Sequence, residues 1–176
     1  MKWIYGRQDW KTLERGLENC YLLTNGLGGF SSFTMTGAVA RNDHSVFMSC
    51  TKAPNHRINM IHRMKEELDI GESKYVLSTQ EFADGTKEEG YRYLTEFSFE
   101  ILPSWRYLIN GIEIEKEIVM AQGSNQIAVN YHLKNRGQKE AALCVTPFFQ
   151  FEPKGEDLKE DKIFSRQEQK ITDGKY

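Results

Sequence analysis

The chain has 176 residues, a formal net charge of −2 and a sequence pI near 6.1. This length suffices for one domain with a substantial core, and is too short for a β-sandwich joined to a second catalytic domain. Charges of both signs are interspersed, which excludes the basic field that nucleic-acid binding needs. No apolar run approaches the roughly 18 residues of a membrane span, and the N-terminus has no secretory signal pattern. We therefore expect a cytoplasmic protein with no nucleic-acid or membrane partner.

The cysteine and histidine spacings argue against disulfide and metal chemistry. Cys20, Cys50 and Cys144 are odd in number and widely separated, so they fit neither a disulfide framework nor a Cys-x-x-Cys zinc site. His56 and His62 lie six positions apart on a predicted strand, with no third ligand at metal spacing. We expect reduced thiols, no metal and no cofactor.

The first third of the chain predicts short strands around a glycine-rich turn. Residues 1–5 form a short strand, and Asp9 is placed to cap a helical turn over 10–17. A run of β-favouring residues follows the glycine turn, and 45–50 is a further strand. The apolar pattern of 56–68 suits a strand or a helix, and the neighbouring strands favour the strand.

The middle of the chain has a two-residue period. A short strand is predicted at 74–79, followed by a turn at 83–86. Between 91 and 101, Tyr91, Tyr93, Phe97, Phe99 and Ile101 occupy odd positions and Arg92, Glu96, Ser98 and Glu100 occupy even ones, which predicts a strand with one apolar face that ends at Pro103.

The dipeptide Asn110-Gly111 is the strongest hairpin signal in the sequence, and it separates predicted strands at 105–109 and 112–120. Lys116 interrupts the apolar face of the second arm. Its ammonium group therefore either reaches the sheet edge or pairs with a carboxylate.

Two further strands, at 127–133 and 143–149, follow polar turns. Successive short alternating strands predict an all-β, antiparallel fold with two packed sheets, because one open sheet would leave edges and an apolar face exposed. We expect a sandwich domain at 1–151 and a charged segment at 152–176, formed by weak strands or a truncated linker. The ending at 173–176, just after a turn signal, suits a chain cut inside a larger protein.

The candidate site is a glycine-rich turn followed by a strand and a polar cluster. Its members are Asn25, Gly26, Gly28, Gly29, Arg41, Asp43 and His44. Glycine permits positive φ and close approach to the backbone, and the polar side chains can form directed contacts. Together they predict one wall of a polar site. The alternative is a hairpin and buried strand whose Arg and His make structural hydrogen bonds. No Lys-Ser/Thr pair or helix follows the glycines, so they do not form a phosphate loop.

Residues 22–44 resemble the opening signature of the N-terminal domain of prokaryotic glycogen debranching enzymes. That signature reads Leu-x-Thr-Asn-Gly-x-Gly-Gly-Tyr, then a Ser/Thr-rich strand and Arg-Arg-Tyr-His-Gly. The matching positions are Leu22, Thr24, Asn25, Gly26, Leu27, Gly28, Gly29, Gly37, Arg41 and His44, with Phe30 as the aromatic. The departures are Asn42 for the second Arg, Asp43 for Tyr and Ser45 for Gly.

Further family elements occur in the same order along residues 18–147. They are Pro54 with Arg57, Glu66-Glu67-Leu68, Gly90 to Leu94 with Phe97, Pro103-Ser-Trp105-Arg-Tyr107, and Glu115-Lys116 with Met120 and Asn125. The resemblance implies a galactose-mutarotase-like β-sandwich that precedes an (α/α) toroidal catalytic domain. In the family this toroid carries the catalytic carboxylates for α-1,6-glucosidic hydrolysis. The glycine turn with Arg41 and His44 would then shape the glucan cleft or the domain interface.

No catalytic residue is assigned in this chain, and we expect the isolated chain to be inactive. Glycoside hydrolysis needs two carboxyl groups flanking one bond, whereas Glu113, Glu115 and Glu117 alternate onto a solvated strand face. Trp105 and Tyr107 are candidate stacking platforms for a sugar ring, or else core residues.

Three functions stay open at this stage. The first is a non-catalytic domain of a debranching enzyme-like protein, which packs on the toroid and contacts α-glucan such as glycogen or maltooligosaccharide. The second is a free-standing glucan-binding module. The third is a structural or homo-oligomerisation domain whose polar cluster binds nothing.

Overall fold

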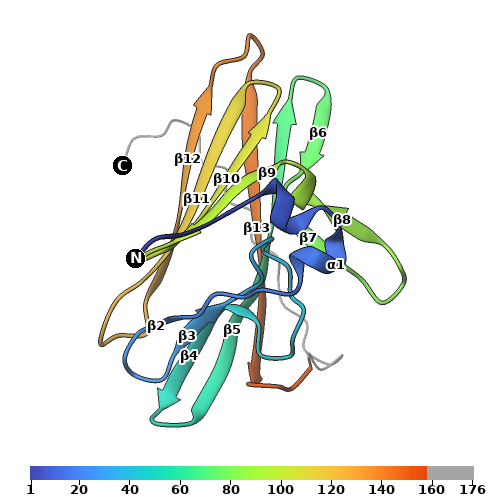
Figure 1. Ribbon diagram of the computed structural model, residues 1–176. Helices are drawn as coiled ribbons and strands as arrows, with labels where there is room; N and C mark the ends of the chain where they lie inside the picture. Colours follow the sequence, from blue (N-terminus) through green and yellow to red (C-terminus); the bar gives the residue numbers. More distant parts are fainter. Residues whose placement is uncertain (158–176) are drawn as a thin grey trace.

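The alternating strands form two facing antiparallel sheets in the computed structural model, which describes residues 1–157 (Figure 1). The first sheet has five strands in the order β1-β9-β10-β11-β12. Their bounds are β1 Trp3–Gly6, β9 Leu94–Phe99, β10 Pro103–Ile109, β11 Ile112–Met120 and β12 Ile127–Asn135. This sheet contains the hairpin predicted at Asn110-Gly111, whose residues have φ of 47° and 81°. Positive φ at both central positions matches the twist of the flanking strands.

The second sheet has six strands, in the order β13-β5-β4-β3-β2 with β6 also paired to β5. Their bounds are β2 Leu23–Thr24, β3 Phe30–Ser32, β4 Ser45–Lys52, β5 His56–Ile70, β6 Ser73–Val76 and β13 Ala141–Pro153. A separate hairpin joins β7 Thr79–Glu81 to β8 Lys87–Glu89. The ambiguous stretch 56–68 is therefore a strand, and both the all-β class and the two-sheet antiparallel sandwich are confirmed.

The core lies between the two sheets, and Trp105 is at its centre. Its side chain is 1% exposed, and its indole N–H donates to the backbone carbonyl of Met35 at 2.9 Å. The rings of Tyr21 and Phe97 lie 5.4 and 5.2 Å from it, centroid to centroid. Trp105 is a core residue, and the suggestion that it offers a platform to sugar or to a partner is wrong, because no ring face reaches the surface.

An ion pair crosses the core between the sheets. The Lys116 ammonium lies 2.5 Å from Oε1 of Glu66, and the Tyr131 hydroxyl donates to the same oxygen at 2.7 Å. The Lys116 and Glu66 side chains are only 11% and 6% exposed. Of the two roles open to Lys116, pairing with a carboxylate is therefore the correct one.

Two local predictions differ from the structure in detail: a short helix does lie within 10–17 but is not capped by Asp9, and the strand after the glycine turn is shorter than the β-favouring run. Asp9 lies within a 3-10 helix, η1 Arg7–Trp10, and its carboxylate accepts from the Gly6 N–H at 2.8 Å. The cap of the next helix, α1 Leu13–Gly16, is Thr12. Only Phe30–Ser32 of the β-favouring run is a strand, because the hydroxyl of Thr34 binds Ala38 and turns the chain.

The strand predicted from residue 91 begins later. A 3-10 helix, η2 Gly90–Arg92, precedes β9, and its first residue, Gly90, passes so close to the backbone of Leu77 that no Cβ would fit there. The stretch 74–79 is likewise divided between β6 and β7. Strand β13 continues to Pro153, past the boundary expected at 151, and the segment 158–176 lies outside the described residues. Within residues 1–157, no helix has the length and apolarity needed to cross a membrane.

Candidate functional site

Asn25 builds the glycine turn with its own side chain. Its Oδ1 accepts the N–H groups of Leu27 and Gly29, each at 3.0 Å, and its backbone N–H donates to the Gly29 carbonyl at 3.2 Å. Gly26 and Gly28 have φ of 77° and 95°, in the left-handed region that side chains disfavour. The amide and the glycines thus fold the segment locally, as an Asx-type turn does.

The same asparagine ties this turn to the other sheet. Its Nδ2 donates to the Ser124 carbonyl at 2.9 Å and to Oδ1 of Asn125 at 3.1 Å. The Gly123 N–H donates to the Asn25 carbonyl at 2.8 Å, and the Gln122 amide donates to the Thr24 carbonyl at 2.7 Å. The loops β2–β3 and β11–β12 accordingly lie side by side (Figure 1). We call this arrangement of residues 24–29 and 122–125 the inter-sheet clamp.

The glycines of the clamp are required by packing. A Cβ on Gly29 would lie 2.8 Å from Nδ2 of Asn25, and one on Gly28 would lie 3.1 Å from the Pro54 carbonyl oxygen. The Gly28 carbonyl accepts from Nε of Arg57 at 2.6 Å. Gly28 and Gly29 thus pack within the second sheet and its β4–β5 loop, and Asn25 joins the turn to the loop of the other sheet. Nothing in their geometry points to a ligand.

His44 has a similar structural role in the loop before β4. It is 1% exposed, and its ring Nδ1 accepts the backbone N–H of Ala40 at 3.0 Å. The backbone N–H of His44 donates to the Arg41 carbonyl at 2.9 Å. Burial lowers its pKa, and the nearby Asp43 carboxylate opposes that effect. Asp43 also pairs with Lys154 at 3.5 Å, which joins this loop to the end of β13.

The structure does not bring the glycine turn and the Arg41–His44 loop together. In the pairing of β3 with β4, Phe30 faces Met48 and Ser32 faces Ser45. The turn therefore lies near the end of β4 and the loop at its start, a separation of about 16 Å for five residues of strand. The glycine turn and the Arg41–His44 loop, which were predicted to form one polar site, therefore lie in different parts of the molecule.

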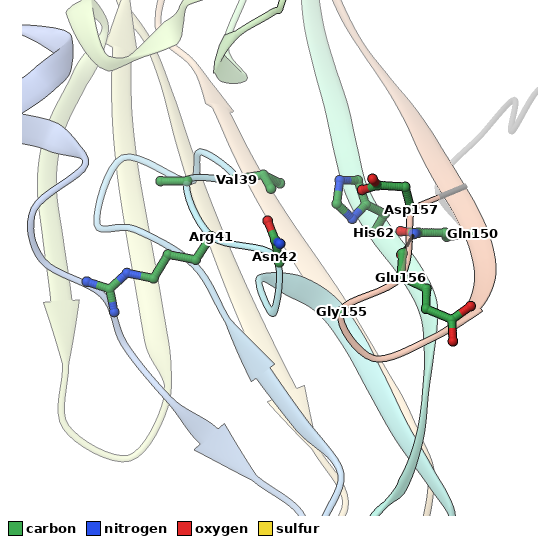
Figure 2. A pocket seen from close by; sticks show the side chains of 9 residues that line it. Val39, Arg41, Asn42, His62, Gln150, Gly155, Glu156 and Asp157 are labelled. Atoms are coloured by element: carbon green, nitrogen blue, oxygen red, sulfur yellow. Dashed lines mark hydrogen bonds between the residues drawn. The ribbon is translucent and has the colours of Figure 1, made fainter. Parts of the chain in front are cut away.

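The loop lines a cavity of about 280 Å³ instead. Its lining residues are Val39, Ala40, Arg41, Asn42, His62, Gln150, Gly155, Glu156 and Asp157. They come from the loop before β4, from β5, from β13 and from the segment just after it. Figure 2 shows Asn42 on one side, His62 and Gln150 on the other, and the Arg41 side chain pointing away. Of the predicted site residues, Arg41 alone is among the lining residues.

A buried hydrogen-bond network supports the His62 wall. Oγ of Ser45 donates to Oδ1 of Asn59 at 2.7 Å. Nδ2 of Asn59 donates to Oε1 of Gln150 at 3.0 Å and lies 3.2 Å from Nδ1 of His62. Nε2 of Gln150 donates to the Glu156 carbonyl at 2.7 Å. Burial lowers the pKa of His62, and the Arg63 guanidinium lowers it further, so the ring is neutral at pH 7.

This cavity offers hydrogen-bonding groups but no hydrolytic pair. Glycosidic hydrolysis needs two carboxyl groups facing one bond from opposite sides. Glu156 and Asp157 are neighbours in the chain, and their side chains point in different directions in Figure 2. Sequence reasoning missed His62, Asn59 and Gln150 as one unit. The sequence signal for this group is the presence of polar residues within the predicted strands, at positions that face the protein interior.

Comparison with known proteins finds a match to one family. The model of the family described as "Glycogen debranching enzyme N terminal" matches residues 19–176. No match is found among curated proteins or among solved structures.

Proposed function

Because the chain belongs to the glycogen debranching enzyme N-terminal family, we propose that it acts as the non-catalytic N-terminal domain of a debranching enzyme-like protein. In this role it supports hydrolysis of α-1,6-glucosidic branches during glycogen breakdown. It does so by packing against a C-terminal (α/α) toroidal catalytic domain and by contacting the glucan chain.

The family match over residues 19–176 is the observation that carries this proposal. The cavity adds support for a non-catalytic role, since its Glu156 and Asp157 do not face one another across a space for a glycosidic bond. Cys20, Cys50 and Cys144 are free thiols, which fits a reducing compartment, and we place the function in the cytoplasm.

The test combines the purified chain with a separately produced toroidal domain of a glycogen debranching enzyme. Glucose release from a branched limit dextrin and co-elution on gel filtration are measured. We expect no release by the chain alone, and more release by the pair than by the toroid alone, with the two proteins co-eluting. Hydrolysis by the chain alone would contradict the non-catalytic role. A pair that neither co-elutes nor gains activity would contradict the packing role.

A further inference from the structure

We propose that the cavity between the loop 39–42 and the end of β13 binds one neutral sugar unit of an α-glucan, with Nε2–H of His62 as donor to a sugar hydroxyl. The choice of an α-glucan rests on the function proposed above. The choice of a neutral, hydroxyl-bearing ligand rests on the cavity itself.

The charges and side chains around the cavity disfavour an anion or a metal ion. Glu156 and Asp157 belong to its lining; the Asp157 carboxylate lies on the same side as His62, whereas the Glu156 carboxylate and the Arg41 guanidinium point away (Figure 2), so an anion such as phosphate has no matched cation there. Within residues 1–157, no group of three or more His, Cys, Asp or Glu side chains could hold a metal ion. Neutral hydroxyl groups, which both donate and accept, match this lining of amides, carboxylates and imidazole.

His62 presents a defined donor to this cavity. Its Nδ1 lies 3.2 Å from Nδ2 of Asn59, which can only donate, so Nδ1 is the acceptor nitrogen of a neutral ring. The proton therefore resides on Nε2, the nitrogen on the opposite side of the ring. His62 is a lining residue, and within residues 1–157 this N–H has no hydrogen-bond partner, so it can donate to a ligand oxygen.

The orientation of that donor is set before a ligand arrives. Asn59 is 3% exposed, and its amide is held by Ser45 on one side and Gln150 on the other. A wall fixed by buried hydrogen bonds loses little conformational entropy on binding, which favours a built site over an incidental hollow.

The size and floor of the cavity fit a single ring. Its volume of about 280 Å³ is close to the lower bound of roughly 300 Å³ for small-molecule pockets. Val39 and Ala40 add apolar atoms to the lining, against which the carbon-bound face of a pyranose can pack.

The experiment titrates the folded chain with maltotriose, using calorimetry and amide chemical shifts, with inorganic phosphate as a separate probe. His62→Asn keeps an acceptor near Nδ1 and removes the Nε2 donor, so we expect affinity to fall about tenfold. His62→Gln places a donor near Nε2 and should recover part of that loss. His132→Asn, on the exposed face of β12, is the matched control and should leave affinity unchanged.

Asn42→Ala keeps the proposal falsifiable if the His62 variants do not fold, because Asn42 is exposed and lines the same cavity. It should weaken maltotriose binding several-fold with circular dichroism unchanged. Equal affinity in the wild type and in the His62 or Asn42 variants would overturn this site while leaving the debranching role standing. Absence of maltotriose binding, or phosphate binding at these residues, would overturn the inference. The debranching role is judged separately by the assay with the toroidal domain.

Discussion

Replacing Lys116 by methionine leaves the Glu66 carboxylate buried between the sheets without its cation. The two side chains are 11% and 6% exposed, and the ammonium also lies 5.3 Å from the centroid of the Trp105 ring. Removing one partner of a buried pair costs about 3–5 kcal/mol. Tyr131 still donates to Glu66 and offsets part of this loss. We therefore expect the free energy of unfolding to fall by about 3 kcal/mol.

Urea unfolding followed by tryptophan fluorescence measures this change, and the double variant separates its causes. Glu66→Gln removes the carboxylate charge and leaves an amide oxygen that Tyr131 can still bind. Lys116→Met with Glu66→Gln should therefore lie within about 1.5 kcal/mol of the wild type. Lys134→Met, on the exposed side of β12, is the control and should change stability by less than about 0.5 kcal/mol. A single variant that costs under 1 kcal/mol, or a double variant as unstable as the single, would refute this reasoning.

Three further predictions concern the clamp, the buried histidines and the core. Asn25→Ala removes side-chain bonds that hold the clamp and should cost about 3 kcal/mol in urea unfolding; a loss below 1 kcal/mol would contradict the structural role. Burial lowers the pKa of His44 and His62 in the folded state, so below about pH 6.5 the unfolded state binds more protons than the folded state does. The urea midpoint should therefore fall as the pH drops further. A midpoint that rises would contradict this prediction. Trp105→Phe leaves the Met35 carbonyl without its donor and should cost about 1–3 kcal/mol with maltotriose affinity unchanged; lost affinity at full stability would place the ring at a ligand.

Local sequence signals predicted the sheets well because strands and tight turns depend on neighbouring residues. The hairpin at Asn110-Gly111 needs only two residues that tolerate positive φ between alternating arms. The apolar face of β11 could likewise be assigned residue by residue, with Lys116 as the marked exception. Thr12 and Gly90 were missed, because a cap or a close backbone approach depends on what packs nearby.

The site could not be derived in the same way, because its parts are far apart in sequence. Asn25 binds groups at 124 and 125, and the cavity combines residues near 40, at 62 and beyond 150. A single sequence contains the residue types but not these pairings. The motif around 22–44 carries the family resemblance, and in the structure the hydrogen bonds of Asn25 and His44 mainly hold the backbone of their own loops. Of the side chains that line the cavity, His62 and Gln150 lie on β5 and β13, whose pairing register only the fold defines.

The inter-sheet clamp has a consequence for the order of events during protein synthesis. Asn25 leaves the ribosome about one hundred residues before its partners Ser124 and Asn125. While β4 to β11 are translated, the N-terminal loop of the nascent chain therefore lacks its hydrogen-bond partners. Contacts of such long sequence separation slow folding, because the intervening chain must lose its freedom first. Emergence of the β11–β12 turn is then the step that closes this end of the sandwich. A ribosome stalled before residue 123 would expose the loop to proteases, and one stalled well beyond it would not.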